Sequence, residues 1–205
     1  MKHDPMTQAT LALSLSEIAA LSARATRGAG RSWGEAEETA EAACWLARAG
    51  LDWAGALLEV LQSPDAGAEC ALRAGIALAD AAALSGTPPN IQFRVNSCCF
   101  LLPFAARMSD QTGQRIRLTA ADTQIVLAPG ACPLISGPVR MPGPAQVTLT
   151  SDLQDRTLCP DWPQSHRGTV LAIEYARLTE LMMAFTVPTS AHSQAGAGAQ
   201  SDDND

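Results

Sequence analysis

The apolar residues of the first 86 positions recur every three or four residues, which is the period of an amphipathic helix. Ser14 and Glu17 have the spacing of a capping box, and Ser32 with Glu35 repeats that spacing. Glycines and short polar loops separate the helical stretches. We therefore expect four helices within residues 14–86, the third of them capped by Asp52.

The fourth of these helices, residues 70–84, carries only Arg73 and Asp80 as charged side chains. A helix that is apolar nearly all round is typical of a buried position. We therefore expect this helix to be the central one of the fold.

Beyond residue 90 the apolar period changes to two. Alternation of apolar and polar residues begins at Ile91, and further β-rich runs follow at 116–120, 123–127 and 146–150. Glycine and proline turns between such runs predict an antiparallel sheet. The apolar stretch 98–106 contains Pro103 and has no clear period. Residues 128–144, rich in proline and glycine, are expected to form a long surface loop.

A last helix is expected at about residues 171–185, before Pro188. By composition alone, residues 189–205 are typical of a disordered tail. The predicted class is α+β, with N-terminal helices packed on a mostly antiparallel β-sheet and closed by the last helix. The predicted organisation is an N-terminal extension 1–13, a single domain 14–188 (helical 14–86, β-rich 91–151) and a C-terminal tail 189–205.

Charge and cysteine usage exclude several function classes. The chain has 14 basic and 21 acidic residues, a net charge of −7 at pH 7. Nucleic acids and anionic membranes bind basic surfaces, so neither is expected as a partner. None of the six cysteines stands in a C-x-x-C pair or close to a histidine, so we expect no metal site and no cofactor. The thiols are interpreted as reduced, which is typical of a cytoplasmic protein.

Short motifs are distributed along nearly the whole chain. They comprise residues 14–18 (SLSEI), 27–30 (RGAG), 33–38 (WGEAEE), 45–47 (WLA), the pattern Cys70-x-Leu72-x-x-Gly75-x-x-Leu78-x-Asp80, Val187-Pro188, Ser193, residues 196–199 (GAGA) and 203–205 (DND). Together they resemble a bacterial family known as domain of unknown function 3726. That family has no established activity, so the resemblance supplies no chemistry. It does imply that the C-terminal segment is docked or recognised.

At two positions near the C-terminus the chain differs from the family that it resembles. Similar proteins carry a glutamate and an arginine after the proline, where this chain has Ala191 and Gln194. If those charges act chemically in the relatives, the resemblance implies that this chain is an altered or inactive copy.

The loop before the second expected helix has several interpretations. A glycine-rich loop at a helix N-terminus can hold a phosphate, whereas the same glycines can serve a turn between two helices. Glu35, Glu37 and Glu38 at the start of the helix would repel a phosphate and favour the turn. Alternatively, Arg27 and Arg31 could form with Glu37 and Glu38 a polar cluster for a cationic or zwitterionic ligand, or the four could be a solvated charged face.

Two function classes follow. The favoured one is an accessory or interaction subunit of a metabolic system, whose tail docks on the protein itself or on a partner, either another protein or a second copy. The alternative is an enzyme or binder of a small polar metabolite, with its site between the Arg27–Glu38 loop and the tail. We find no known catalytic motif, so the catalytic residues stay unassigned. The candidate site residues are Arg27, Gly28, Gly30, Trp33, Gly34, Glu37, Glu38, Ser193, Gly196, Gly198, Asp203, Asn204 and Asp205.

Overall fold

The computed structural model describes residues 9–62, 69–86, 90–140, 144–151, 158–163 and 166–185. Helices and antiparallel strands are both present in this part of the chain, so the predicted α+β class is confirmed. Along the chain the elements are β1 (Thr10–Ser14), α1 (Leu15–Gly28), α2 (Trp33–Arg48), α3 (Trp53–Gln62), α4 (Ala71–Ser85), β2 (Ile91–Val95), α5 (Cys98–Thr112), β3 (Ile116–Ala120), β4 (Thr123–Leu127), β5 (Leu134–Ser136), β6 (Ala145–Ser151), β7 (Arg167–Leu171) and α6 (Ala172–Phe185).

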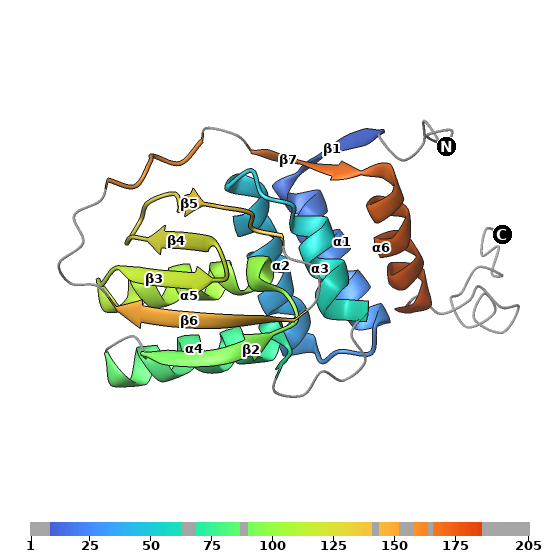
Figure 1. Ribbon diagram of the computed structural model, residues 1–205. Helices are drawn as coiled ribbons and strands as arrows, with labels where there is room; N and C mark the ends of the chain where they lie inside the picture. Colours follow the sequence, from blue (N-terminus) through green and yellow to red (C-terminus); the bar gives the residue numbers. More distant parts are fainter. Residues whose placement is uncertain are drawn as a thin grey trace, which may run out of the picture.

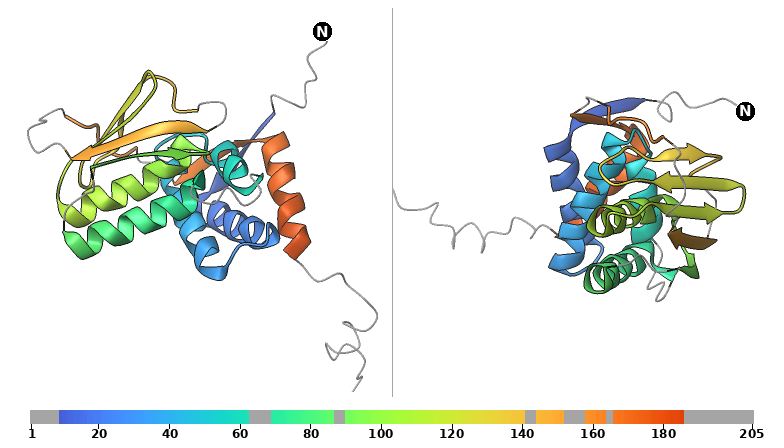
Figure 2. Two further views of the ribbon diagram at one scale, coloured as in Figure 1. Left: turned by 60° about the horizontal axis from the view of Figure 1, so that its bottom comes forward. Right: turned by 90° about the vertical axis from the view of Figure 1, so that its left-hand side faces the viewer.

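Five of the strands form one antiparallel sheet with the order β2-β6-β3-β4-β5. Helix α5 packs against β3 and β4, and α4 packs along α5. Both helices lie on the same side of the sheet (Figure 2). Because alternate residues of a strand point to opposite faces, Ile116, Leu118 and Ala120 are buried while Arg117 and Thr119 between them are partly exposed.

The other elements gather beside this sheet (Figure 1). Strands β1 and β7 pair antiparallel, and α1 packs between α2 and α6. Trp53, at the start of α3, donates from its indole N–H to the carbonyl of Thr169 in β7 at 3.0 Å. One hydrophobic core runs through both groups and includes Ile18 of α1, Leu118 of β3 and Leu178 of α6.

The two predicted capping boxes are confirmed. The Ser14 and Ser32 side chains accept from the backbone N–H of Glu17 and Glu35, and each glutamate accepts in return from the N–H of its serine. The expected packing of N-terminal helices on the sheet is not confirmed for α1 and α2, which pack on each other.

The expectation that the fourth helix is central was wrong. Helix α4 buries one face only, and its Leu84 is 90% exposed. The central helix is α5, where Phe100, Leu101 and Phe104 are at most 1% exposed. Most apolar residues of α4 are alanines, which bury little surface, so a high apolar fraction did not indicate a central position.

Strands β1, β5 and β7 and helix α5 lie where the sequence pattern predicts no such element. Helix α5 falls inside the segment described as β-rich, and β5 falls inside the predicted loop 128–144. Strand β1 occupies most of the described part of the predicted extension 1–13, because it pairs with β7 at the other end of the chain. Pairing over such a distance leaves no local sequence signature.

Candidate functional site

The glycine loop after α1 forms a Schellman motif. The N–H of Arg31 donates to the carbonyl of Thr26 at 3.2 Å, the N–H of Gly30 donates to that of Arg27 at 3.0 Å, and Gly30 has a φ of +80°. These two N–H groups satisfy the end of α1 and are not available to a phosphate. The geometry therefore supports the interpretation of this loop as a turn between two helices.

At Gly28 the backbones of α1 and α6 are in close contact. A Cβ at this position would overlap the backbone carbonyl of Leu181 and would lie 3.4 Å from the backbone nitrogen of Met182. Backbone atoms cannot turn aside as a flexible side chain can. Gly28 thus serves the packing of α6 on α1.

Arg27 and Trp33 lie together, and Phe185 at the end of α6 completes the group, which we call the aromatic surface. The guanidinium carbon of Arg27 is 4.6 Å from the centre of the Trp33 ring and 5.3 Å from that of Phe185. The two rings meet edge to face, with their centres 5.6 Å apart. Arg27 also donates to the carbonyl of Arg31. Trp33 is nevertheless 63% exposed, so a large aromatic ring is held in place on the outside of the protein.

The acidic residues of the predicted cluster lie apart from Arg27. Glu38 forms an ion pair at 2.7 Å with Arg107 of α5, which also binds Glu41 at 2.8 Å. Glu37 is exposed. The structure therefore brings Arg27 together with Trp33 and does not bring either of them together with Glu38.

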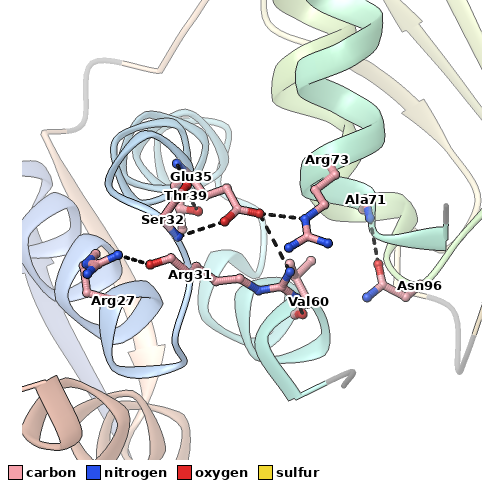
Figure 3. A network of polar contacts seen from close by, with 9 residues as sticks. All are labelled: Arg27, Arg31, Ser32, Glu35, Thr39, Val60, Ala71, Arg73 and Asn96. Carbon is pink, nitrogen blue, oxygen red and sulfur yellow. Dashed lines mark hydrogen bonds and ion pairs between the residues drawn. The ribbon is translucent and has the colours of Figure 1, made fainter. Parts of the chain in front are cut away.

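The side chain of Arg31 belongs to a network around Glu35, while its backbone carbonyl accepts from Arg27 (Figure 3). A Glu35 oxygen lies 2.8 Å from Arg73 of α4 and 3.8 Å from Arg31, and the other accepts from the N–H of Ser32 at 2.9 Å. Burial raises the pKa of Glu35, but the hydrogen bonds from Arg73 and Ser32 outweigh it, so that the pKa lies below its usual range. A carboxylate held in this way joins α2 to α4 and is a poor proton carrier.

The remaining predicted site residues have different positions. Gly34 lies in the first turn of α2, and beyond its chain neighbours and the backbone of its own helix no atom lies within 4 Å of where its Cβ would be. The predicted tail residues Ser193, Gly196, Gly198, Asp203, Asn204 and Asp205 lie outside the described residues, as do Ala191 and Gln194.

A second polar group, the Arg140 cluster, was not predicted. Arg140 follows β5 and lies 2.6 Å from Asp52, 3.2 Å from Glu59 and 3.4 Å from Glu174. Gly55 leaves room for it, because a Cβ there would lie 2.7 Å from an Arg140 nitrogen. The four charged residues come from α6, the loop after β5, and α3 with the residue before it. Their large separation along the chain explains why no motif indicated them.

Glu174 is the most buried carboxylate of this cluster, with 9% of its side chain exposed. It lines a pocket of about 230 Å³ together with Asp52, Leu51 and Val170. Burial and the negative charge of Asp52 raise the pKa of Glu174, and Arg140 offsets only part of that rise. The cluster thus holds a carboxyl group whose proton is retained more readily than usual.

The helices that build these sites carry a family signature. Residues 13–89 match the sequence model of a family described as Protein of unknown function (DUF3726). This N-terminal segment of the chain is therefore similar to that family. No curated protein and no solved structure matches the chain.

The DUF3726 match covers α1 to α4 and ends before β2, so the five-stranded sheet lies outside it. Arg27 and Trp33 lie within the matched residues, whereas Phe185 does not. Asp52 and Glu59 likewise lie within the match, whereas Arg140 and Glu174 do not. In both sites, side chains of the family segment therefore meet side chains from the rest of the chain.

Replacing Glu174 by glutamine tests the charge balance of the Arg140 cluster. Because the pKa of Glu174 is raised in the folded state above its ordinary 4.5, the wild type loses stability as the pH rises from 4.5 through the folded pKa. Glutamine has no such titration. We expect Glu174→Gln to melt a few degrees higher than the wild type near neutral pH and at about the same temperature near pH 4. A variant that is less stable than the wild type at neutral pH would contradict the expected balance of charges.

None of the helices in the described part of the chain is long and apolar enough to cross a membrane. All six cysteines lie in the described part of the chain and none forms a disulfide there. Cys98 and Cys99 are buried. Burial raises the pKa of the Cys98 thiol to about 12. A thiol with that pKa is protonated at neutral pH, which makes it a poor nucleophile.

Proposed function

We propose that this protein is an accessory protein that binds another polypeptide through the aromatic surface and the C-terminal segment 186–205. The observation that carries the proposal is the exposure of Trp33 at 63% while its ring is fixed against Arg27 and Phe185. Aromatic and arginine side chains are the residues that contribute most to protein interfaces, and a ring that is already held loses little freedom on binding.

The chemistry of the partner follows from the same two elements. Phe185 is followed directly by residues 186–205, which contain Asp202, Asp203 and Asp205 and no lysine or arginine. An exposed ring in contact with Phe185, after which an acidic stretch of sequence follows, suits a partner that presents apolar side chains next to a basic groove. The alternative, a metabolite site between Arg27 and Glu38, has less support because Glu38 is paired with Arg107.

The test is the mass of the native protein purified, with a tag at the N-terminus, from cells that produce it naturally. We expect a second polypeptide at a fixed ratio, and we expect it to be lost from Trp33→Ala and from a chain ending at Phe185. Both variants should melt within a few degrees of the wild type, because Trp33 is exposed and residues 186–205 lie beyond α6.

Leu84→Ala is the matched control, since Leu84 is also exposed and apolar but lies on α4. It should retain the partner. A native mass equal to one copy of the chain, or a partner retained equally by all three variants, would overturn the proposal. A native mass equal to two copies would mean that the partner is a second copy of this chain.

A further inference from the structure

A pocket of about 340 Å³ opens between α2 and α5, away from the Arg140 cluster. It is lined by Glu41, Ala42, Cys44, Trp45, Arg48, Pro103, Arg107 and Asp110. Its volume is at the lower end of the range for small-molecule sites, which suits a ligand of few atoms. The pocket shares no lining residue with the aromatic surface.

The apolar wall of this pocket is supported by contacts with neighbouring residues. The Trp45 ring meets the ring of Trp162 edge to face, with centres 5.5 Å apart. Trp162 in turn donates from its indole N–H to the carbonyl of Gly130 at 3.0 Å. Pro103, with its closed ring, lines the pocket as well. An apolar part of a ligand would therefore meet a surface that is already ordered.

The charged residues of the lining balance one another. The lining contains Arg48, Arg107, Glu41 and Asp110, so the formal charge of these four side chains sums to zero. Arg107 is occupied by Glu38 and Glu41. Arg48 is held differently: its guanidinium carbon lies 5.0 Å from the centre of the Trp162 ring, and it has no carboxylate partner among the described residues.

Asp110 provides the opposite charge. One of its oxygens accepts from the backbone N–H of Gly130 at 2.7 Å, which fixes the carboxylate. The structure shows no cationic partner for Asp110 among the described residues. A guanidinium and a carboxylate line one pocket with an apolar wall, each held by a neighbour and each without an ion-pair partner in the described part of the chain.

We propose that this pocket binds a small zwitterion of the size of a free amino acid. The carboxylate of the ligand would be held by Arg48, its ammonium group by Asp110, and its apolar side chain would lie on Trp45 and Pro103. Arginine provides two parallel N–H donors to a carboxylate, and stacking on Trp162 already orients them. The neutral lining disfavours ligands that carry a single net charge.

Tryptophan fluorescence of the full chain tests this site, because Trp45 lines it. The first probe is L-leucine. The other standard amino acids are then tested, and the one that binds most tightly replaces it. Its two analogues are 3-methylbutylamine, which lacks the carboxylate, and 4-methylpentanoate, which lacks the ammonium group. We expect a saturable change with the amino acid, and binding weaker by about tenfold or more with either analogue.

Arg48→Gln and Asp110→Asn should each weaken binding about tenfold, and Arg48→Lys should retain part of it. Arg24→Gln, an exposed arginine of α1 outside the pocket, is the matched control and should bind as the wild type does. No saturable change with any standard amino acid would overturn the proposal. Binding of either analogue as tightly as the amino acid, or unchanged binding by Arg48→Gln, would overturn it as well. None of these results bears on the proposed partner surface at Trp33.

Discussion

Replacement of Gly28 by alanine is expected to lower the free energy of unfolding by about 3 kcal/mol, the upper end of what forced overpacking costs. The added methyl group would overlap the backbone carbonyl of Leu181, and two helix backbones would have to separate to accommodate it. Other contacts of α6 cannot offset this loss of stability, since only Glu174 and Leu178 are buried among its side chains. Urea unfolding followed by circular dichroism measures the change.

Gly34→Ala is the control for this prediction. Gly34 also lies in a helix, but beyond its chain neighbours and the backbone of its own helix no atom lies within 4 Å of its Cβ position, so alanine there should be neutral or stabilising by less than about 1 kcal/mol. If the two alanine variants unfolded at the same urea concentration, Gly28 would not be the contact that holds α6 on α1.

The same substitution connects packing to the proposed function. Phe185 reaches Trp33 only because the last turns of α6 pack closely on α1. Displacement of α6 by Gly28→Ala would move Phe185 away from Arg27 and Trp33 and would leave the Trp33 ring free to rotate. A folded Gly28→Ala protein should therefore lose the proposed partner, although residue 28 is not part of the aromatic surface.

Local sequence signals predicted the helices well. Both capping boxes and the glycine that ends α1 act through residues at most five positions apart, so the chain itself displays them. Helix α5 was missed because Pro103 lies inside it and because its side chains are buried on most sides, which removes the helical period. Strands β1 and β7 were missed because each is stabilised by the other.

The candidate sites show the same division. Arg27 and Trp33 are six residues apart, on either side of one turn, and sequence reasoning included both. Phe185 joins them only through the packing of α6, and Glu38 leaves them because Arg107 of α5 offers a closer partner. Arg140 stands in a stretch predicted to be a loop, and its carboxylates lie 88, 81 and 34 residues away. Proximity of this kind is a product of the fold, and composition does not reveal it.

The second large effect is expected at Arg140. Its replacement by methionine keeps most of the side-chain volume but leaves Asp52, Glu59 and the buried Glu174 without their common counter-charge. Removal of one partner from a fully buried ion pair costs about 3 to 5 kcal/mol. Because about half of the Arg140 side chain is exposed, solvent screening reduces the expected loss near neutral pH to about 2 kcal/mol. Arg94→Met is the control: its ion pair with Glu69 spans 3.8 Å at the surface and should contribute less than about 0.5 kcal/mol.

The pH dependence separates this electrostatic loss from a loss of packing. Arg140 lowers the pKa of Glu174, so its removal lets that pKa rise further above 4.5. The carboxyl group is then protonated in the folded Arg140→Met protein over a wider range, and the deficit relative to wild type should grow as the pH rises from 4.5 to neutral. A deficit that is equal at pH 4 and at neutral pH would mean that Arg140 acts by packing.

A double substitution completes the argument. If the charge of Glu174 causes much of the loss, Arg140→Met should cost about 1 kcal/mol less in a Glu174→Gln background than in the wild type. Strict additivity of the two substitutions would instead assign the loss to Asp52 and Glu59, which face the same guanidinium from the α3 side. In either case the cluster joins α3 of the DUF3726 segment to α6 and the loop after β5, which come from the rest of the chain. Its strength therefore determines how firmly α6, and with it Phe185, is held next to the family segment.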